Sequence, residues 1–230
     1  MTRSIETHAL RTERTARFHT LGDPATAREV WYVLHGYGQS ARAFLGEFEP
    51  LATPARLFVS PEGLSRFYLR GTSGRIGASW MTREDRESEI ADYVRYLEAL
   101  EERLALGPAV RRGVLGFSQG TATAGRWAVL GSRPPERLVL CSGGLPPDLD
   151  PAATRAALAR TELSVVVGDA DPYIDDRAVA AELARLEELG MRPRVRFFAG
   201  DHRLDLGSLE ECLGPAGASG QASAAGPPVS

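Results

Sequence analysis

The sequence predicts an α/β fold in which a mainly parallel central sheet has helices on both faces. Short apolar runs, several of them ending in glycine, alternate with amphipathic stretches along most of the chain, as strands and helices do in βαβ units. The apolar runs lack the polar alternation of a half-exposed strand, which is typical of a parallel sheet covered on both faces. The length of 230 residues, 43% hydrophobic and 25% charged, suits one globular domain.

The first half of the chain begins with weak patterns and ends with the strongest helix. Residues 5–20 mix threonines and apolar residues with charges, which predicts an edge hairpin. Residues 64–81 show neither period, so we expect a long loop there. Thr82 is expected to cap a helix at 83–106, because Asp85 stands three residues later and acids fill the first turn. Buried strands are expected at 28–40 and 55–63, with a short helix at 41–52.

The second half repeats strand and helix regularly. Strands are expected at 110–118, 136–144, 162–172 and 192–200. Helices are expected from Ser118 onward and at 152–160, 175–190 and 203–213. Residues 1–213 thus form a single α/β domain with no large lid, because the segment between 144 and 162 is too short for one. Residues 214–230 carry no charge and are rich in Gly, Ala, Ser and Pro, which predicts a flexible tail.

Composition excludes several classes of function. The 27 positive side chains are all arginine, so a P-loop lysine and a Schiff-base lysine are both impossible. Asparagine is also missing, which removes any N-glycosylation sequon. A formal net charge of −3 gives no electrostatic reason to expect nucleic acid as a partner.

Partner and location follow from features of the same kind. Cys141 and Cys212 lie in unlike contexts and form no ligand cluster, so we interpret both as buried small hydrophobic residues and expect no metal site. No run of 18 apolar residues exists and the first residues lack a signal-peptide pattern, so we expect no membrane span and a cytoplasmic location. The oligomeric state stays open, with a homodimer as one option.

The stretch GFSQG, residues 116–120, places a serine between two glycines where a strand turns into a helix. G-x-S-x-G at such a junction is the nucleophile elbow of an α/β hydrolase. The elbow lifts the Ser118 hydroxyl above the sheet edge, at the positive end of the following helix. The alternative is a serine N-cap flanked by incidental glycines. The motif predicts an α/β-hydrolase fold with Ser118 as the nucleophile.

The acid and the histidine of such a site follow the serine, each beyond the carboxyl end of a later strand. Of the four histidines, only His202 follows Ser118, and it lies just past the last expected strand. The preceding strand ends in Asp169 and Asp171. We favour Asp171, which lies further into the loop, whereas Asp169 is expected to bond its own turn. Asp201 is interpreted as structural.

Acyl transfer also needs N–H donors for the oxyanion. The backbone N–H of Gln119, directly after the nucleophile, is one expected donor, and that of Tyr37, in the turn LHGYG, is the other. His35 is expected to support this loop rather than to act as a base. Trp80 and Met81 are expected to border the substrate pocket. The alternative is that the aromatic residues of their loop pack it onto the sheet.

The motifs LHGYG, GFSQG, GDADP and GDH, in this order and spacing, resemble the carboxylesterase/phospholipase family of α/β hydrolases, which includes bacterial esterases and acyl-protein thioesterases. The resemblance covers roughly residues 28–213. It implies a serine esterase without a cofactor, in which Ser118, His202 and Asp171 are the catalytic residues and Tyr37 and Gln119 donate to the oxyanion. The acid loop and the residue before the histidine differ from the usual family pattern.

We therefore expect a serine carboxylesterase that cleaves small-molecule esters with short to medium acyl chains through an acyl-enzyme. A thioesterase or lysophospholipase of the same family is the main alternative. A peptidase or lactonase, or a non-catalytic binding member of the fold, also stays open. A dehalogenase needs an aspartate nucleophile and a dienelactone hydrolase a cysteine, so Ser118 disfavours both.

Overall fold

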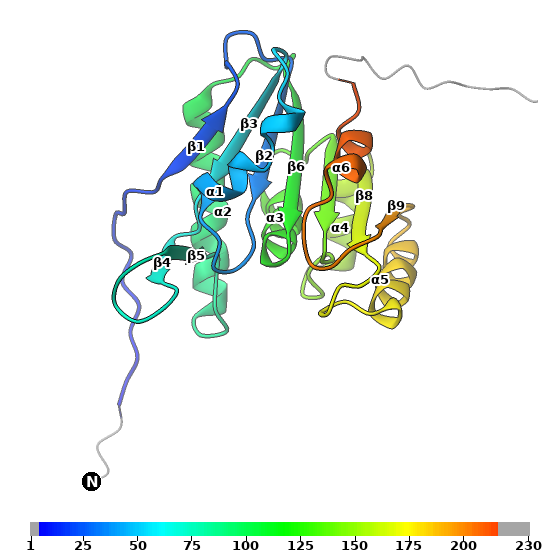
Figure 1. Ribbon diagram of the computed structural model, residues 1–230. Coiled ribbons are helices and arrows are strands. Elements are labelled where there is room, and N and C mark those ends of the chain that lie inside the picture. The colour runs from blue at the N-terminus through cyan, green and yellow to red at the C-terminus, as the bar shows by residue number, and fades with distance from the viewer. Residues whose placement is uncertain (1–4, 216–230) are drawn as a thin grey trace, which may run out of the picture.

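A seven-stranded sheet runs through the computed structural model, which describes residues 5–215 (Figure 1). Its strands are β1 (Phe18–Leu21), β2 (Glu29–Leu34), β3 (Arg56–Pro61), β6 (Arg111–Phe117), β7 (Arg137–Cys141), β8 (Glu162–Gly168) and β9 (Arg194–Phe198). They are ordered β1-β3-β2-β6-β7-β8-β9. β1 runs antiparallel to β3 and every other pair of neighbours is parallel, which confirms the expected mainly parallel sheet.

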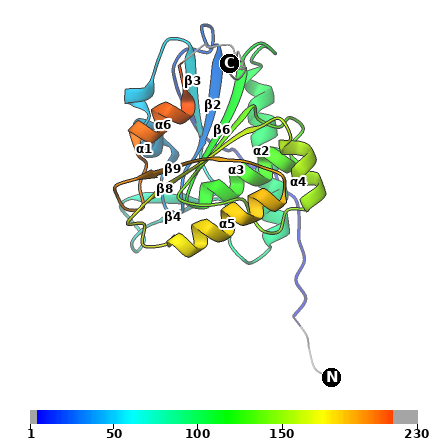
Figure 2. The same ribbon diagram turned by 90° about the vertical axis from the view of Figure 1, so that its right-hand side faces the viewer.

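Helices cover both faces of this sheet (Figure 2). One face carries α1 (Ala41–Gly46), the 3-10 helix η1 (Glu49–Leu51) and α6 (Leu206–Leu213). The other carries α2 (Arg86–Leu104), α3 (Gln119–Leu130), α4 (Pro151–Leu158) and α5 (Asp176–Glu188). Each face has its own apolar core, with Phe44 and Leu209 in one and Leu97 and Trp127 in the other. The expected three-layer arrangement is confirmed.

The direction in which successive strands are added to the sheet reverses between β2 and β6. From β2 the chain moves outward to β3, whereas β6 pairs with the opposite side of β2. In open α/β sheets such a switch point leaves a crevice beyond the carboxyl ends of the two strands, where ligands bind. The loop after β2 and the turn after β6, which contains Ser118, both lie at the carboxyl ends of these two strands.

Residues 64–81 form a small hairpin, so the expectation of a long loop was wrong. β4 (Ser65–Tyr68) pairs antiparallel with β5 (Ile76–Ser79). The hairpin is too short for a clear alternation, but its backbone bonds the loop after β2. Gly38 donates to the Ala78 carbonyl at 2.9 Å, and Ala78 donates to the Gln39 carbonyl at 3.0 Å. A Cβ on Gly77 would lie 2.3 Å from the Gly38 carbonyl oxygen, so only glycine permits this contact.

Two further expectations were wrong at their boundaries. Residues 5–17 contain no strand, so β1 stands alone and pairs with β3 instead of with a hairpin partner. The long helix begins at Arg86 rather than after Thr82, because Asp85 adopts a left-handed conformation with φ 50°. Thr82 still bonds the helix, since its hydroxyl donates to Glu89 at 3.2 Å.

A buried ion cluster lies at the amino ends of the strands, opposite to the crevice. Glu29 opens β2 and is fully buried, and arginines open the three strands β3, β6 and β7. The guanidinium groups of Arg56, Arg111 and Arg137 lie 2.5, 2.9 and 2.6 Å from the Glu29 carboxylate. Arg56 also donates to the Gly214 carbonyl at 2.7 Å. This Glu29 cluster therefore ties four strands to the end of α6.

The remaining expectations concern the cysteines, the tail and membrane spans. Cys141 is buried and Cys212 partly buried, and both are free thiols. The predicted tail at 214–230 lies outside the described residues except for its first two positions. Within residues 5–215, no helix combines the length and apolar character needed to cross a bilayer.

Candidate active site

Ser118 occupies a strained turn between β6 and α3. Its backbone has φ 53° and ψ −119°, a conformation that costs a non-glycine residue about 1–3 kcal/mol. The turn is held from both sides: the Ser118 N–H donates to the Cys141 carbonyl at 2.9 Å, and its own carbonyl accepts the Thr121 hydroxyl at 2.7 Å. The Ser118 hydroxyl makes no capping bond to α3. The N-cap interpretation therefore fails, and the hydroxyl is left available.

Glycine is required on both sides of this turn. A Cβ on Gly116 would lie 2.3 Å from the Gly120 carbonyl oxygen, and one on Gly120 would lie 2.1 Å from the Leu34 carbonyl oxygen. The turn thus packs directly against the end of β2. A Cβ on Gly36 would lie 3.2 Å from the Ser118 Cβ. The loop after β2 and the serine are therefore immediate neighbours.

The structure brings the predicted acid and histidine together. The Nδ1 atom of His202 lies 2.7 Å from Oδ2 of Asp171, and the Tyr173 N–H donates to Oδ1 at 2.9 Å. Burial raises the pKa of the Asp171 carboxyl, but the Tyr173 N–H and the His202 ring outweigh it, and this pKa lies below its ordinary value. Asp171 is therefore ionised at neutral pH and orients the imidazole.

The other two aspartates considered for this role lie elsewhere. The Asp169 carboxylate was expected to bond its own turn, but it accepts the Gly200 N–H at 3.0 Å instead and joins the two loops at their bases. Asp201 is exposed and its nearest cationic group is Arg203, at 3.8 Å. Neither bonds His202 in the described structure, which agrees with the preference for Asp171.

Two aromatic rings pack against the imidazole of His202. The Phe117 ring, next to the serine, lies 5.0 Å away, and the Tyr173 ring lies 4.8 Å away and nearly perpendicular. Because Nδ1 bonds Asp171, the free Nε2 is the atom that can accept a proton. Among residues 5–215, no hydrogen bond reaches Nε2 or the Ser118 hydroxyl. Such bonds are often long in an empty site and shorten when substrate binds.

The two expected oxyanion donors are free and adjacent to the serine. In the described chain, the backbone N–H groups of Tyr37 and Gln119 donate no hydrogen bond. His35 fixes the first of them, since its Nδ1 lies 2.8 Å from the Gly36 carbonyl oxygen. Its Nε2 accepts the Gly63 N–H at 3.0 Å. Burial lowers the pKa of His35, so the ring is neutral and serves the loop rather than acting as a base.

The side chain of Gln119 holds the segment that carries Trp80 and Met81. Its amide donates to the Met81 carbonyl at 2.9 Å and accepts the Trp80 N–H at 3.1 Å. Trp80 is only 2% exposed, and its Nε1 donates to the His35 carbonyl at 2.8 Å. This burial favours the packing interpretation of Trp80. Met81 is half-buried, and its sulfur lies 3.5 Å from the Arg126 guanidinium.

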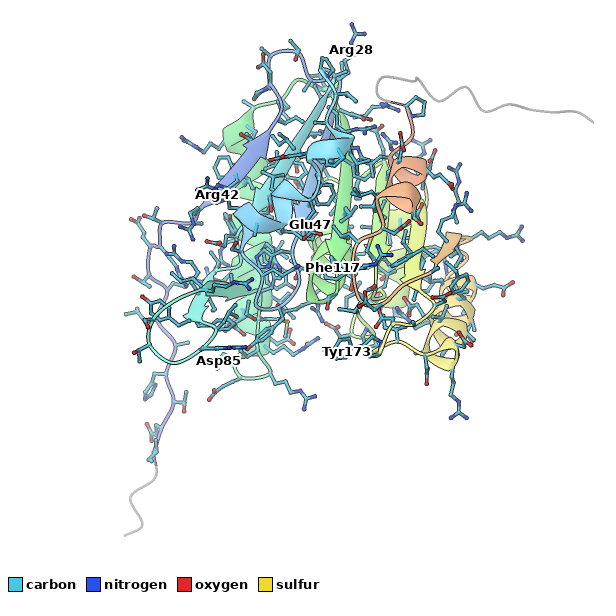
Figure 3. The ribbon with its side chains drawn as sticks, in the orientation of Figure 1. Arg28, Arg42, Glu47, Asp85, Phe117 and Tyr173 are labelled. Atoms are coloured by element: carbon cyan, nitrogen blue, oxygen red, sulfur yellow. The ribbon has the colours of Figure 1, made fainter. Side chains whose placement is uncertain are left out.

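Two tyrosines at the site have strongly exposed rings. Tyr37, whose N–H is an expected oxyanion donor, is 64% exposed and packs on Phe67 at 5.3 Å. Tyr173, next to His202, is 78% exposed. Figure 3 shows Tyr173 and Phe117 near the same end of the sheet, far from Arg28. The contacts of Tyr173 with Asp171 and His202 were not predicted from the sequence, although Tyr173 stands only two residues after Asp171.

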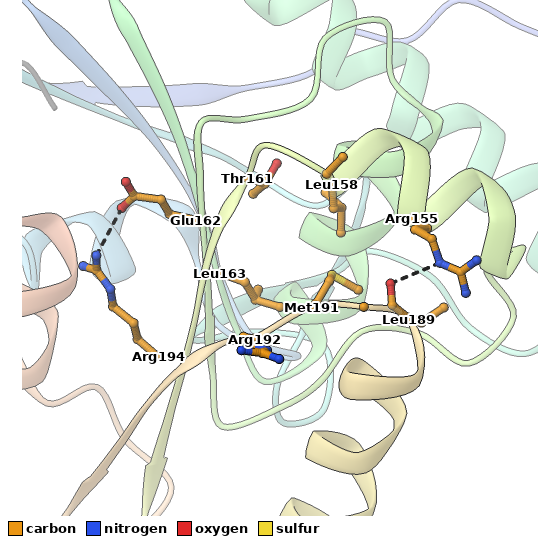
Figure 4. Close-up of a pocket in the computed structure, with 11 residues that line it drawn as sticks. Arg155, Leu158, Thr161, Glu162, Leu163, Leu189, Met191, Arg192 and Arg194 are labelled. Atoms are coloured by element: carbon orange, nitrogen blue, oxygen red, sulfur yellow. Dashed lines mark hydrogen bonds and ion pairs between the residues drawn. The ribbon is translucent and has the colours of Figure 1, made fainter. Parts of the chain in front are cut away.

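Two hollows lie elsewhere on the described surface, and one of them includes Trp80 in its lining. One, of about 480 Å³, lies at the amino ends of β8 and β9 and is lined by Arg155, Leu163 and Met191 among others (Figure 4). Another lies between the N-terminal segment and α2. Among the described residues, no group of three His, Cys, Asp or Glu side chains could hold a metal ion.

Solved structures share this fold, although no protein-family model and no curated protein sequence matches the chain. Zea mays acyl-protein thioesterase 2 aligns with a TM-score of 0.66 at 20% identity, over 86% of this chain and 96% of that one. Esterase PE8 aligns at 0.63 and 23%, over 86% and 96%. A carboxylesterase from Mesorhizobium loti aligns at 0.63 and 19%, over 87% and 95%. The chain has the α/β-hydrolase fold of these proteins.

Proposed function

We propose that this chain is a serine carboxylesterase of the carboxylesterase/phospholipase family and hydrolyses small-molecule esters. The observation that carries the proposal is Ser118, which is held in a strained turn with its hydroxyl uncapped. Strain of this kind is retained where function requires it. The bonded pair Asp171–His202, which packs on the residue next to Ser118, supports the same conclusion.

The proposed reaction has two steps. Ser118 attacks the ester carbonyl while Nε2 of His202 takes the hydroxyl proton and passes it to the leaving alcohol. Water then attacks the acyl-enzyme, with the histidine acting again as base. Asp171 keeps Nδ1 protonated and stabilises the imidazolium. The N–H groups of Tyr37 and Gln119 stabilise the oxyanion in both steps.

The acyl side of the site is proposed to suit short to medium chains. Met81 is half-buried and its backbone is held by Gln119, so we propose that it contacts the acyl chain. Trp80 lies behind it and supports the wall through its bond to the His35 carbonyl. No segment of the described chain forms a large lid over Ser118, which fits a site open to small substrates.

The test is hydrolysis of p-nitrophenyl esters from acetate to dodecanoate by wild type and by Ser118→Ala. Loss of the nucleophile is expected to lower kcat by roughly 10⁴ to 10⁶. Ser88→Ala, an exposed serine on α2, is the matched control and is expected to keep full activity. A folded wild type that cleaves none of these esters, or equal activity in wild type and Ser118→Ala, would overturn the proposal.

Thioester hydrolysis is a second candidate, favoured by the alignment with Zea mays acyl-protein thioesterase 2. The same triad performs both reactions, because the acyl-enzyme is identical and only the leaving group differs. Assaying one acyl chain as an oxygen ester and as a thioester separates the two. A kcat/KM at least tenfold higher for the thioester would make thioesterase the better description.

A further inference from the structure

The backbone of Tyr173 bonds Asp171, but this bond does not explain where the Tyr173 side chain lies. Its N–H donates to Asp171 at 2.9 Å, a bond that almost any residue at this position could supply. The ring contributes nothing to that bond, yet it stands against the His202 ring at 4.8 Å with an interplanar angle of 73°. It is also 78% exposed, the highest value among the Phe, Tyr and Trp residues of 5–215.

The proposed reaction indicates which part of the substrate lies next to the Tyr173 ring. Because Asp171 occupies Nδ1, the leaving oxygen must take its proton from Nε2 of His202. The group attached to that oxygen therefore lies beside the imidazole. Two rings pack on the imidazole. The Phe117 ring is buried, whereas the Tyr173 ring is exposed to solvent and can contact a substrate. Aromatic pairs favour such offset or perpendicular contacts and gain free energy beyond their buried area.

We propose that Tyr173 contacts the leaving group and that the site prefers esters of aromatic alcohols over esters of small alkyl alcohols. This inference rests on the serine esterase activity proposed above and assigns one side of that site. Tyr37, the other exposed tyrosine near Ser118, belongs to the loop of the proposed oxyanion donor and packs on Phe67. The two tyrosines thus flank the reacting carbonyl from different directions, and only Tyr173 adjoins the histidine.

Two acetate esters separate the leaving group from the rest of the reaction. Phenyl acetate and ethyl acetate form the same acetyl-enzyme, so they differ only in acylation. Tyr173→Ala is expected to lower the ratio of kcat/KM for phenyl acetate to kcat/KM for ethyl acetate by about three- to tenfold. The rate of acetyl-enzyme hydrolysis is expected to stay unchanged. Tyr173→Phe keeps the ring and is expected to keep the ratio.

Tyr68→Ala is the matched control. Tyr68 is a half-exposed tyrosine on β4 that pairs across the hairpin with Ile76, and it touches none of the catalytic residues. It is expected to leave both esters unaffected. Circular dichroism and thermal melting show whether each variant is folded, and the exposure of both rings makes large losses of stability unexpected.

The outcomes distinguish this inference from the proposed function. If Tyr173→Ala slows both esters equally and also slows acetyl-enzyme hydrolysis, the ring positions His202 and the leaving-group role is wrong. An unchanged ratio with unchanged rates overturns it as well. A wild type inert toward both esters, or activity that survives Ser118→Ala, would instead overturn the proposed function and this inference with it.

Discussion

The Nδ1 atom of His35 lies 2.8 Å from the carbonyl oxygen of Gly36, and this bond, together with the Gln39 N–H that donates to the same oxygen at 3.2 Å, sets the direction of the neighbouring Tyr37 N–H. The two groups belong to one planar peptide unit and point in opposite directions. Fixing the carbonyl therefore aims the N–H away from His35. In the proposed reaction the buried histidine would act on the site through the backbone of this peptide.

Replacing His35 by phenylalanine tests this relationship. The aromatic ring can still stack on Trp80, but both hydrogen bonds of the imidazole are lost. We expect kcat to fall by about ten- to a hundredfold with little change in KM, somewhat less than the roughly 10² to 10³ lost with a complete oxyanion donor. Steady-state kinetics below the melting temperature of the variant measure this. A variant with wild-type kcat and only a lowered Tm would show that His35 is purely structural.

The free energy of unfolding should decrease in two stages as the pH is lowered. Burial lowers the pKa of His35 below its ordinary value of 6.5, so between these two values the unfolded chain binds a proton that the folded chain does not. Stability therefore declines as pH falls below 6.5. The depressed pKa of Asp171 provides stability above 3.8 that is lost as pH falls through its folded value. Burial also lowers the pKa of His19, which adds to the first stage.

Urea unfolding between roughly pH 8 and pH 4 measures the first stage. His35→Phe is expected to flatten the slope just below 6.5. His8→Gln, in the exposed N-terminal segment, is expected to leave it unchanged. A wild-type stability independent of pH from 7 to 5 would contradict the neutral, buried state of His35.

Ser118→Gly should stabilise the fold while abolishing activity. Glycine adopts φ 53° without the penalty that a side chain incurs, so the free energy of unfolding is expected to rise by about 1 kcal/mol. Ser118→Ala removes the same hydroxyl but keeps the Cβ, and is expected to give no such gain. Chemical denaturation of the two variants side by side measures the difference. Equal stabilities would show that the turn is not strained.

Trp80→Ala should affect stability more than substrate preference. The indole is buried in the core beside Tyr93, and removing a tryptophan from a core typically costs 3–5 kcal/mol. Met81→Ala is the companion variant, expected to shift the preferred chain length at a smaller cost in stability. The p-nitrophenyl ester series and thermal melting give both readouts. A shift in chain length for Trp80→Ala alone would restore Trp80 as the pocket wall.

Glu29→Gln should destabilise the protein without altering its chemistry. The carboxylate faces three arginines inside the protein, and removing one partner of a buried ion pair costs about 3–5 kcal/mol. The cluster lies at the amino ends of the strands, far from Ser118, so kcat/KM is expected to stay unchanged at temperatures where the variant is folded. Glu162→Gln, whose exposed carboxylate lies 4.0 Å from Arg194, is the control and should cost less than 1 kcal/mol.

Most of the fold could be predicted because its central strands are buried on both faces and therefore appear as continuous apolar runs. The pairing of β7 with β8, for example, follows from two such runs separated by the short helix α4. The β4–β5 hairpin escaped prediction because its order comes from tertiary contacts: the Gly38–Ala78 bond and the close approach at Gly77. The start of α2 was predicted too early because Asp85 adopts a left-handed conformation, and nothing in the surrounding sequence indicates it.

The candidate site divides in the same way. Ser118, Asp171 and His202 could be found because each follows a recognisable strand in a fixed order. A supporting role for His35 in its loop was expected from the sequence, but the bond of its ring to the Gly36 carbonyl could be found only in the structure. The burial of Trp80 likewise could not be predicted, because its backbone N–H bonds the side chain of Gln119, which is 39 residues away in the sequence.

The Glu29 cluster has a practical consequence for attaching the protein to a support. Two arginines of this cluster bond the end of α6: Arg137 donates to the Leu213 carbonyl and Arg56 to the Gly214 carbonyl. The chain thus passes residue 215 at the pole of the molecule opposite to Ser118. A surface tether or fusion partner attached there through a short connection would leave the turn that carries Ser118 facing the solution.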